Sequence, residues 1–141
     1  MNTSTAGARP SSARDRMIGI GCAILGALAL VTALTMAVDP AGFLDGAGGF
    51  GTVNEHLVRD LATWTATLGV TLLAAARIAS WRVPLLAFAA LQGALHAINH
   101  AFDADLADPG WKGWGTVAVQ LALTGVIVWL LVAAHRQETR S

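Results

Sequence analysis

The chain has 141 residues, of which 55% are hydrophobic and only 13% are charged, and its formal net charge is zero. A soluble domain of this size cannot bury so much apolar surface, because small domains have a high surface-to-volume ratio, so the composition favours a membrane protein. The zero net charge argues against nucleic acid as a partner, which would require a basic face. The single cysteine, Cys22, excludes an internal disulfide and a multi-cysteine metal site.

The first predicted element is a tail, residues 1–16, rich in Ser, Thr, Ala and Gly and expected to be disordered and cytoplasmic. Residues 17–38 follow without a charge and are long enough to cross a bilayer core of about 30 Å as a helix. A cleaved signal peptide is the alternative for this segment. Its apolar run exceeds the roughly 7–15 residues of a signal, which favours a retained span.

Three further apolar segments are predicted to span the membrane, at residues 54–76, 83–101 and 114–134. Prolines lie near the segment boundaries, where they are tolerated, at Pro40, Pro84 and Pro109. The second segment begins either with a capping box over residues 52–55 or with Asn54 as the cap. The glycine-rich stretch 45–51 is interpreted as a flexible connector, since no strand precedes it as in a phosphate-binding loop.

Together these elements predict an all-α fold, an integral membrane antiparallel four-helix bundle over residues 17–135 with a short cytoplasmic tail at 136–141. A protein with two spans and a buried soluble part is the alternative. Arginines precede the first segment, separate the second from the third and follow the fourth: Arg9, Arg14, Arg16, Arg77, Arg82, Arg136 and Arg140. The positive-inside rule then predicts a multi-pass plasma membrane protein with both termini in the cytoplasm.

Polar side chains gather at the two segment ends that a hairpin of the second and third segments would bring to one depth. Charged residues inside spans are costly and are functional candidates by default. The second segment begins with Glu55, His56, Arg59 and Asp60, and the third carries Gln92, His96, Asn99, His100 and Asp103. Rows spaced by four residues place such side chains on one face of each helix. Thr32, Thr35 and Asp39 on the first segment and Thr116, Gln120 and Thr124 on the fourth extend the pattern.

If these rows turn inward, they form a polar cup open to the outside. Its predicted ligand or metal candidates are His56, Asp60, His96 and His100, supported by Glu55, Arg59, Asn99, Asp103, Gln92 and Gln120. Three histidines with a carboxylate suit a divalent transition metal such as Zn²⁺, Fe or Cu²⁺. A haem between two histidines, or a quinone or lipid exchanging protons with His and Asp, are the other ligands considered. No Ser or Cys lies beside the histidines, so no catalytic residue is assigned.

The same residues have a second interpretation without a ligand. Glu55–Arg59 and His56–Asp60 have the spacing of ion pairs within one helix, and Asn99 and the histidines of the third segment can link helices by hydrogen bonds. The chain would then be an accessory or structural subunit of a larger membrane complex, with a membrane protein or a second copy as its partner. Substitution of His96 and His100 separates the two hypotheses.

The pattern resembles the DoxX-like group of small four-helix bacterial membrane proteins. The likeness lies in the size, the four segments, and the Glu55…Arg59-Asp60 stretch followed by Leu68-Gly69-Val70. The resemblance implies a bacterial membrane protein associated with quinone-linked redox complexes. The His96–His100 pair has no counterpart in that resemblance.

Overall fold

The computed structural model describes residues 13–47 and 54–140, which form helices and short turns without a β-strand. The helices are α1 (Ala13–Val38), α2 (Pro40–Ala47), α3 (Glu55–Arg77), α4 (Arg82–Asp103) and α5 (Gly110–Glu138), with 3₁₀ turns η1 (Ala79–Trp81) and η2 (Ala104–Leu106). The four long helices lie over the four predicted segments. Helix α1 begins four residues earlier than expected, inside the predicted tail, whose residues 1–12 lie outside the described part of the chain.

Local hydrogen bonds explain where two of these helices begin. Asn54 caps α3, because its side-chain oxygen accepts a hydrogen bond from the Leu57 amide at 3.1 Å. Asp39 does the same for α2 by accepting from the Gly42 amide at 2.9 Å, and Pro40 occupies the first helical position, where its missing N–H costs nothing. Helix α2 was not predicted, and it takes up the first half of the expected connector between α1 and α3. The alternative capping box includes residues 52 and 53, which lie outside the described residues.

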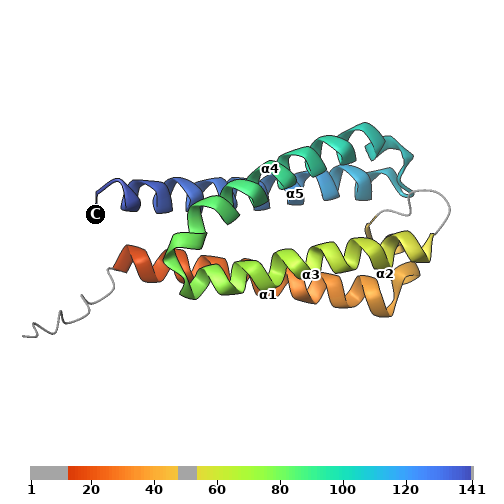
Figure 1. Ribbon diagram of the computed structural model, residues 1–141. Helices are drawn as coiled ribbons and strands as arrows, with labels where there is room; N and C mark the ends of the chain where they lie inside the picture. The colour runs from red at the N-terminus through yellow and green to blue at the C-terminus, as the bar shows by residue number, and fades with distance from the viewer. Residues whose placement is uncertain (1–12, 48–53, 141) are drawn as a thin grey trace, which may run out of the picture.

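The long helices form two antiparallel pairs, α1 with α3 and α4 with α5 (Figure 1). Glycines allow the first pair to approach closely. A Cβ on Gly69 would lie 2.9 Å from the Gly26 carbonyl oxygen, and a Cβ on Gly26 would lie 2.8 Å from the Gly69 carbonyl oxygen. Residues larger than glycine would therefore force α1 and α3 apart. Figure 1 shows the α4–α5 pair on one side of the molecule and the α1–α3 pair on the other, connected where α3 turns into α4.

The buried side chains follow this arrangement. One apolar cluster joins all four long helices near the α3–α4 turn, and its members are Ile18, Cys22, Leu72, Ala75, Leu86, Leu130 and Ala134. A smaller cluster at the opposite end comes from α1 and α3 alone, with Phe43 and Leu44 of α2 packed against it: Met36, Val58 and Ala62. The four long helices thus share a core at one end, whereas the described cluster at the other end comes from α1 and α3, and α5 is linked there to α2.

Three stretches are long and apolar enough to cross a membrane: α1, residues Ala79–Leu106 containing α4, and α5. Helix α3 does not meet the same measure, although it was predicted as a span. The reason is its polarity, because Glu55, Arg59 and Asp60 fall in its first turns and Arg77 closes it. The exposed surface of the other long helices is rich in large apolar side chains such as Ile20, Leu95 and Trp129, as expected for a lipid-facing protein.

Candidate functional site

The charged side chains that open α3 pair within their own helix. Arg59 Nη2 lies 2.9 Å from Glu55 Oε2, and His56 Nε2 lies 3.5 Å from Asp60 Oδ2. All four side chains are exposed, His56 by 88% and Asp60 by 63%. Both contacts follow the four-residue spacing of one helix face, and exposed pairs of this kind contribute little to stability in water.

The histidines of α4 also contact each other, in a different environment. The His96 and His100 rings meet edge to face, with centroids 4.6 Å apart and an interplanar angle of 86°. Both are half-buried, as are Gln92 and Asp103, while Asn99 is exposed. The large apolar side chains on the other side of α4, at Leu91, Leu95, Ile98 and Phe102, are exposed. The polar row of α4 therefore lies on a face turned toward protein, and its apolar row faces outward.

The structure does not bring the α3 and α4 groups together as the hairpin argument expected. Helix α3 packs along α1 and α4 packs along α5, so the hairpin of α3 and α4 opens beyond its turn. Where the two helices do meet, their contacts include the rings of Trp64 and Phe88, with centroids 5.9 Å apart, and the packing of Leu72 with Leu86. Among the described residues, no group of three His, Cys, Asp or Glu side chains is close enough to hold a metal ion. The geometry therefore gives no support to a site made of three histidines and a carboxylate.

Helix α3 also departs from the expectation that every polar row turns inward. Its buried residues, including Val58, Ala62 and Gly69, face α1. Its polar row faces away from them and is exposed; it consists of His56, Asp60, Thr63 and Thr67. We call these four residues the α3 polar row. The row is exposed because the small and apolar side of α3 is occupied by α1.

The remaining candidates lie near α2 and α5. Thr35 and Asp39, expected to face the interior, line a cavity of about 750 Å³ along α1 and α2, together with Leu34, Val38 and Phe43. At the same end, Lys112 Nζ donates to the Asp45 carbonyl oxygen at 3.0 Å and thereby ties α5 to α2. Gln120 is half-buried on α5.

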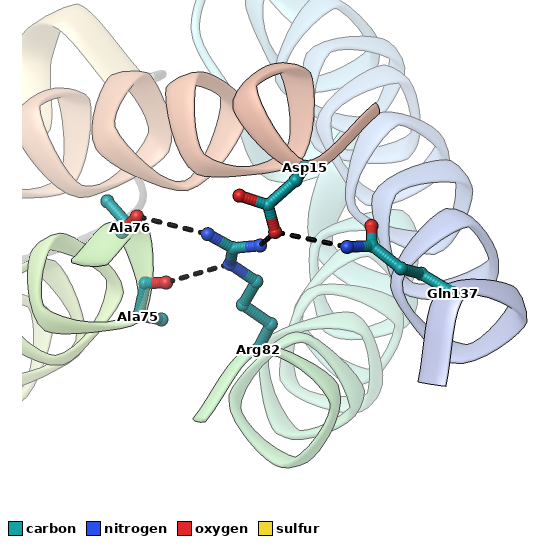
Figure 2. A network of polar contacts seen from close by, with 5 residues as sticks. All are labelled: Asp15, Ala75, Ala76, Arg82 and Gln137. Atoms are coloured by element: carbon teal, nitrogen blue, oxygen red, sulfur yellow. Dashed lines mark hydrogen bonds and ion pairs between the residues drawn. The ribbon is translucent and has the colours of Figure 1, made fainter. Parts of the chain in front are cut away.

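A buried polar cluster that was not predicted joins all four long helices at the opposite end (Figure 2). Its centre is Arg82, the first residue of α4, which is 6% exposed. Arg82 Nη1 donates to Asp15 Oδ1 of α1 at 2.6 Å. Nε and Nη2 donate to the carbonyl oxygens of Ala75 and Ala76 at the end of α3, at 3.1 and 3.2 Å. Gln137 Nε2 of α5 donates to the same Asp15 oxygen at 3.1 Å. We call this cluster the Arg82 clasp.

The clasp has a clear structural role. A buried charge is costly unless it is paired and hydrogen-bonded, and Arg82 is both. It also satisfies carbonyls that have no partner within α3, and it places a cation at the negative end of that helix. Sequence reasoning assigned Arg82 only to orientation. The available signal was Asp15, the one acid among the arginines of residues 1–16, which is a natural counter-ion.

Comparison with known proteins adds no assignment: no protein-family model, curated protein or solved structure matches this chain. The resemblance to the DoxX-like group accordingly stays a prediction.

Proposed function

We propose that this chain is a subunit of a larger membrane assembly, and that the α3 polar row is where it contacts another protein. The supporting observation is the exposure of that row. Helix α3 runs beside α1, a stretch apolar enough to span a membrane, yet it presents His56 and Asp60 outward. Ionisable side chains facing lipid are costly, so membrane proteins turn them toward protein or water. Cover by a neighbouring protein removes that cost.

The topology that belongs to this proposal has four crossings with both termini in the cytoplasm. The start of α1, the end of α3, the start of α4 and the end of α5 lie at one end of the molecule. That end carries the described helix-terminal arginines, which are Arg14, Arg16, Arg77, Arg82, Arg136 and Arg140. The opposite end carries Asp39, Asp45, Asp103, Asp105 and Asp108. The positive-inside rule assigns the arginine end to the cytoplasm of a plasma membrane.

Spin-label accessibility tests the proposal directly. A nitroxide on Thr63→Cys in native membranes is exposed to oxygen if it faces lipid, to a polar nickel reagent if it faces water, and to neither if protein covers it. We expect low accessibility to both reagents. Leu95→Cys, on the exposed apolar face of α4, is the matched control and should show high oxygen accessibility. Oxygen accessibility at residue 63 equal to that at residue 95, or high nickel accessibility there, would overturn the proposal.

A second function, binding of a small ligand at α4, is favoured by the half-buried His96–His100 pair. Two imidazoles at one helix face can ligate a metal ion or exchange protons with a quinone ring oxygen. Gln92 and Asp103 lie on the same face and are half-buried. Elemental analysis and an optical spectrum of protein purified without chelators test this. Near-stoichiometric Zn, Fe or Cu that is lost in the His96→Gln/His100→Gln variant supports a metal, and its absence rejects the metal and haem hypotheses.

A further inference from the structure

We infer that the partner covering the α3 polar row is a second copy of this chain, packed α3 against α3 around a twofold axis perpendicular to the membrane. The inference rests on the proposed function and specifies its partner. Both copies share one orientation in the membrane, so α3 and its symmetry mate run parallel and place identical residues at the same depth. Such an interface must be complementary to itself.

The charges at the start of α3 meet that requirement. Two pairs of an acid and a group that can bear positive charge join its first turn to its second. They are Glu55–Arg59 and His56–Asp60. The members of each pair are four residues apart, which is about 6 Å along the axis. A parallel neighbour can therefore offer Asp60 to the His56 of the first copy and receive the reciprocal contact. The pairs that are exposed in one copy become two symmetric pairs between copies.

The rest of the row permits close approach. Thr63 and Thr67 are exposed and four residues apart, and small residues at this spacing let two membrane helices pack tightly. Their hydroxyls already donate to carbonyl oxygens of α3 itself, Thr63 to Asp60 at 2.7 Å and Thr67 to Thr63 at 2.9 Å. These hydroxyl donors therefore have their hydrogen-bond partners within one copy. The neighbouring copy meets only short side chains. On the C-terminal side of the charged turns, the proposed contact between the two copies of α3 requires only close packing.

The other long helices do not offer such a surface. Exposed large apolar side chains on α1, α4 and α5, such as Val31, Leu95 and Leu121, suit lipid, and both described ion pairs with exposed side chains lie on α3. A homodimer built on α3 therefore covers the row that lipid does not suit and leaves the lipid-compatible faces outside.

Disulfide trapping of the full chain in its native membranes tests the inference. Thr67→Cys lies on the proposed twofold contact, and mild oxidation should convert most of it to a species of twice the chain mass. Leu95→Cys should stay monomeric, and so should the unmodified chain, because its only cysteine, Cys22, is buried. Adding Asp60→Asn to Thr67→Cys should lower the trapped fraction several-fold, whereas adding Asp105→Asn, at an exposed acid outside α3, should not.

The outcomes separate the two proposals. A dimer trapped at residue 67 but not at residue 95 supports the inference. A trapped species of another mass, or no trapped species while the label at residue 63 is inaccessible to oxygen and nickel, overturns the second copy and leaves a different protein as the partner. A lipid-accessible label at residue 63 overturns both.

Discussion

The two ends of the molecule differ in whether their charged side chains are buried or exposed. At the Arg82 end the guanidinium is buried and bonded to α1 and α3, Gln137 of α5 joins through Asp15, and an apolar cluster from all four long helices lies at the same end. At the Asn54 end Glu55, His56, Arg59 and Asp60 pair only within α3 and stay exposed. The first arrangement is complete within one chain. The second leaves charged side chains exposed, which is costly in an apolar environment. The contrast separates polar groups that stabilise the fold from polar groups that are accessible to a partner.

The largest effect should come from breaking the clasp. Arg82→Gln removes the partner of Asp15, whose side chain is 25% exposed, and frees two carbonyl oxygens of α3. Removing one member of a buried ion pair costs about 3 kcal/mol in unfolding free energy. Denaturant titration in detergent measures the loss.

The control is Arg77→Gln, which changes an exposed arginine at the end of α3. Surface substitutions of this kind change the unfolding free energy by no more than about 0.5 kcal/mol. Equal stability of the two variants would show that the Arg82 end is no more dependent on its polar contacts than the surface is.

A smaller effect is expected where α1 and α3 touch. Gly69→Ala places a methyl group 2.9 Å from the Gly26 carbonyl oxygen and 2.8 Å from Leu30 Cγ, so the two helices must shift apart. Overpacking of this kind costs about 1–3 kcal/mol, less what alanine gains in helix propensity. Gly125→Ala, whose added methyl group meets nothing within 4 Å, should be neutral or stabilising. Unfolding in the same detergent compares the pair, and a Gly69→Ala variant as stable as Gly125→Ala would refute the close contact.

The smallest effect on the isolated chain should come from the α3 charges. Glu55→Gln breaks an exposed pair, which changes the unfolding free energy in detergent by about 0.5 kcal/mol or less. Asp60→Asn, in the α3 polar row, should likewise leave the isolated chain stable but lower the fraction trapped at Thr67→Cys, because the Asp60 charge lies at the proposed contact between copies. A large loss of stability in the separated chain would mean that the Asn54 end holds the fold as the Arg82 end does.

The sequence predicted most of the helices but not their partners. Apolar run length and the positions of proline placed four long helices within a few residues of their observed ends, and Asn54 was one of two predicted caps for α3. The hairpin argument placed residues at equal depth by counting along α3 and α4. Counting fixes depth but does not say which helices pack together. The contact between Gly26 and Gly69 brings α1 rather than α4 onto α3, and no local pattern reveals which of two small faces will meet.

The candidate site was predicted in its parts and not in its assembly. His56–Asp60 and His96–His100 each form a contact at the predicted spacing, because a four-residue interval is a local property of a helix. Their meeting depended on tertiary packing. The Arg82 clasp was missed for the complementary reason, since its members come from four separate helices and none of them shows a short-range motif.

The sequence positions of the clasp residues also limit the order in which their contacts can form during synthesis. Gln137 and Asp15 are separated by 122 positions, and Arg82 lies 67 positions after Asp15. Contacts between residues so distant in sequence form late, because a long intervening loop must first be closed. Arg82 therefore cannot reach Asp15 until α4 has been made, and the hydrogen bond from Gln137 forms only when α5 is in place. A nascent chain stalled before residue 82 should consequently be held less firmly in the bilayer than one stalled after residue 137.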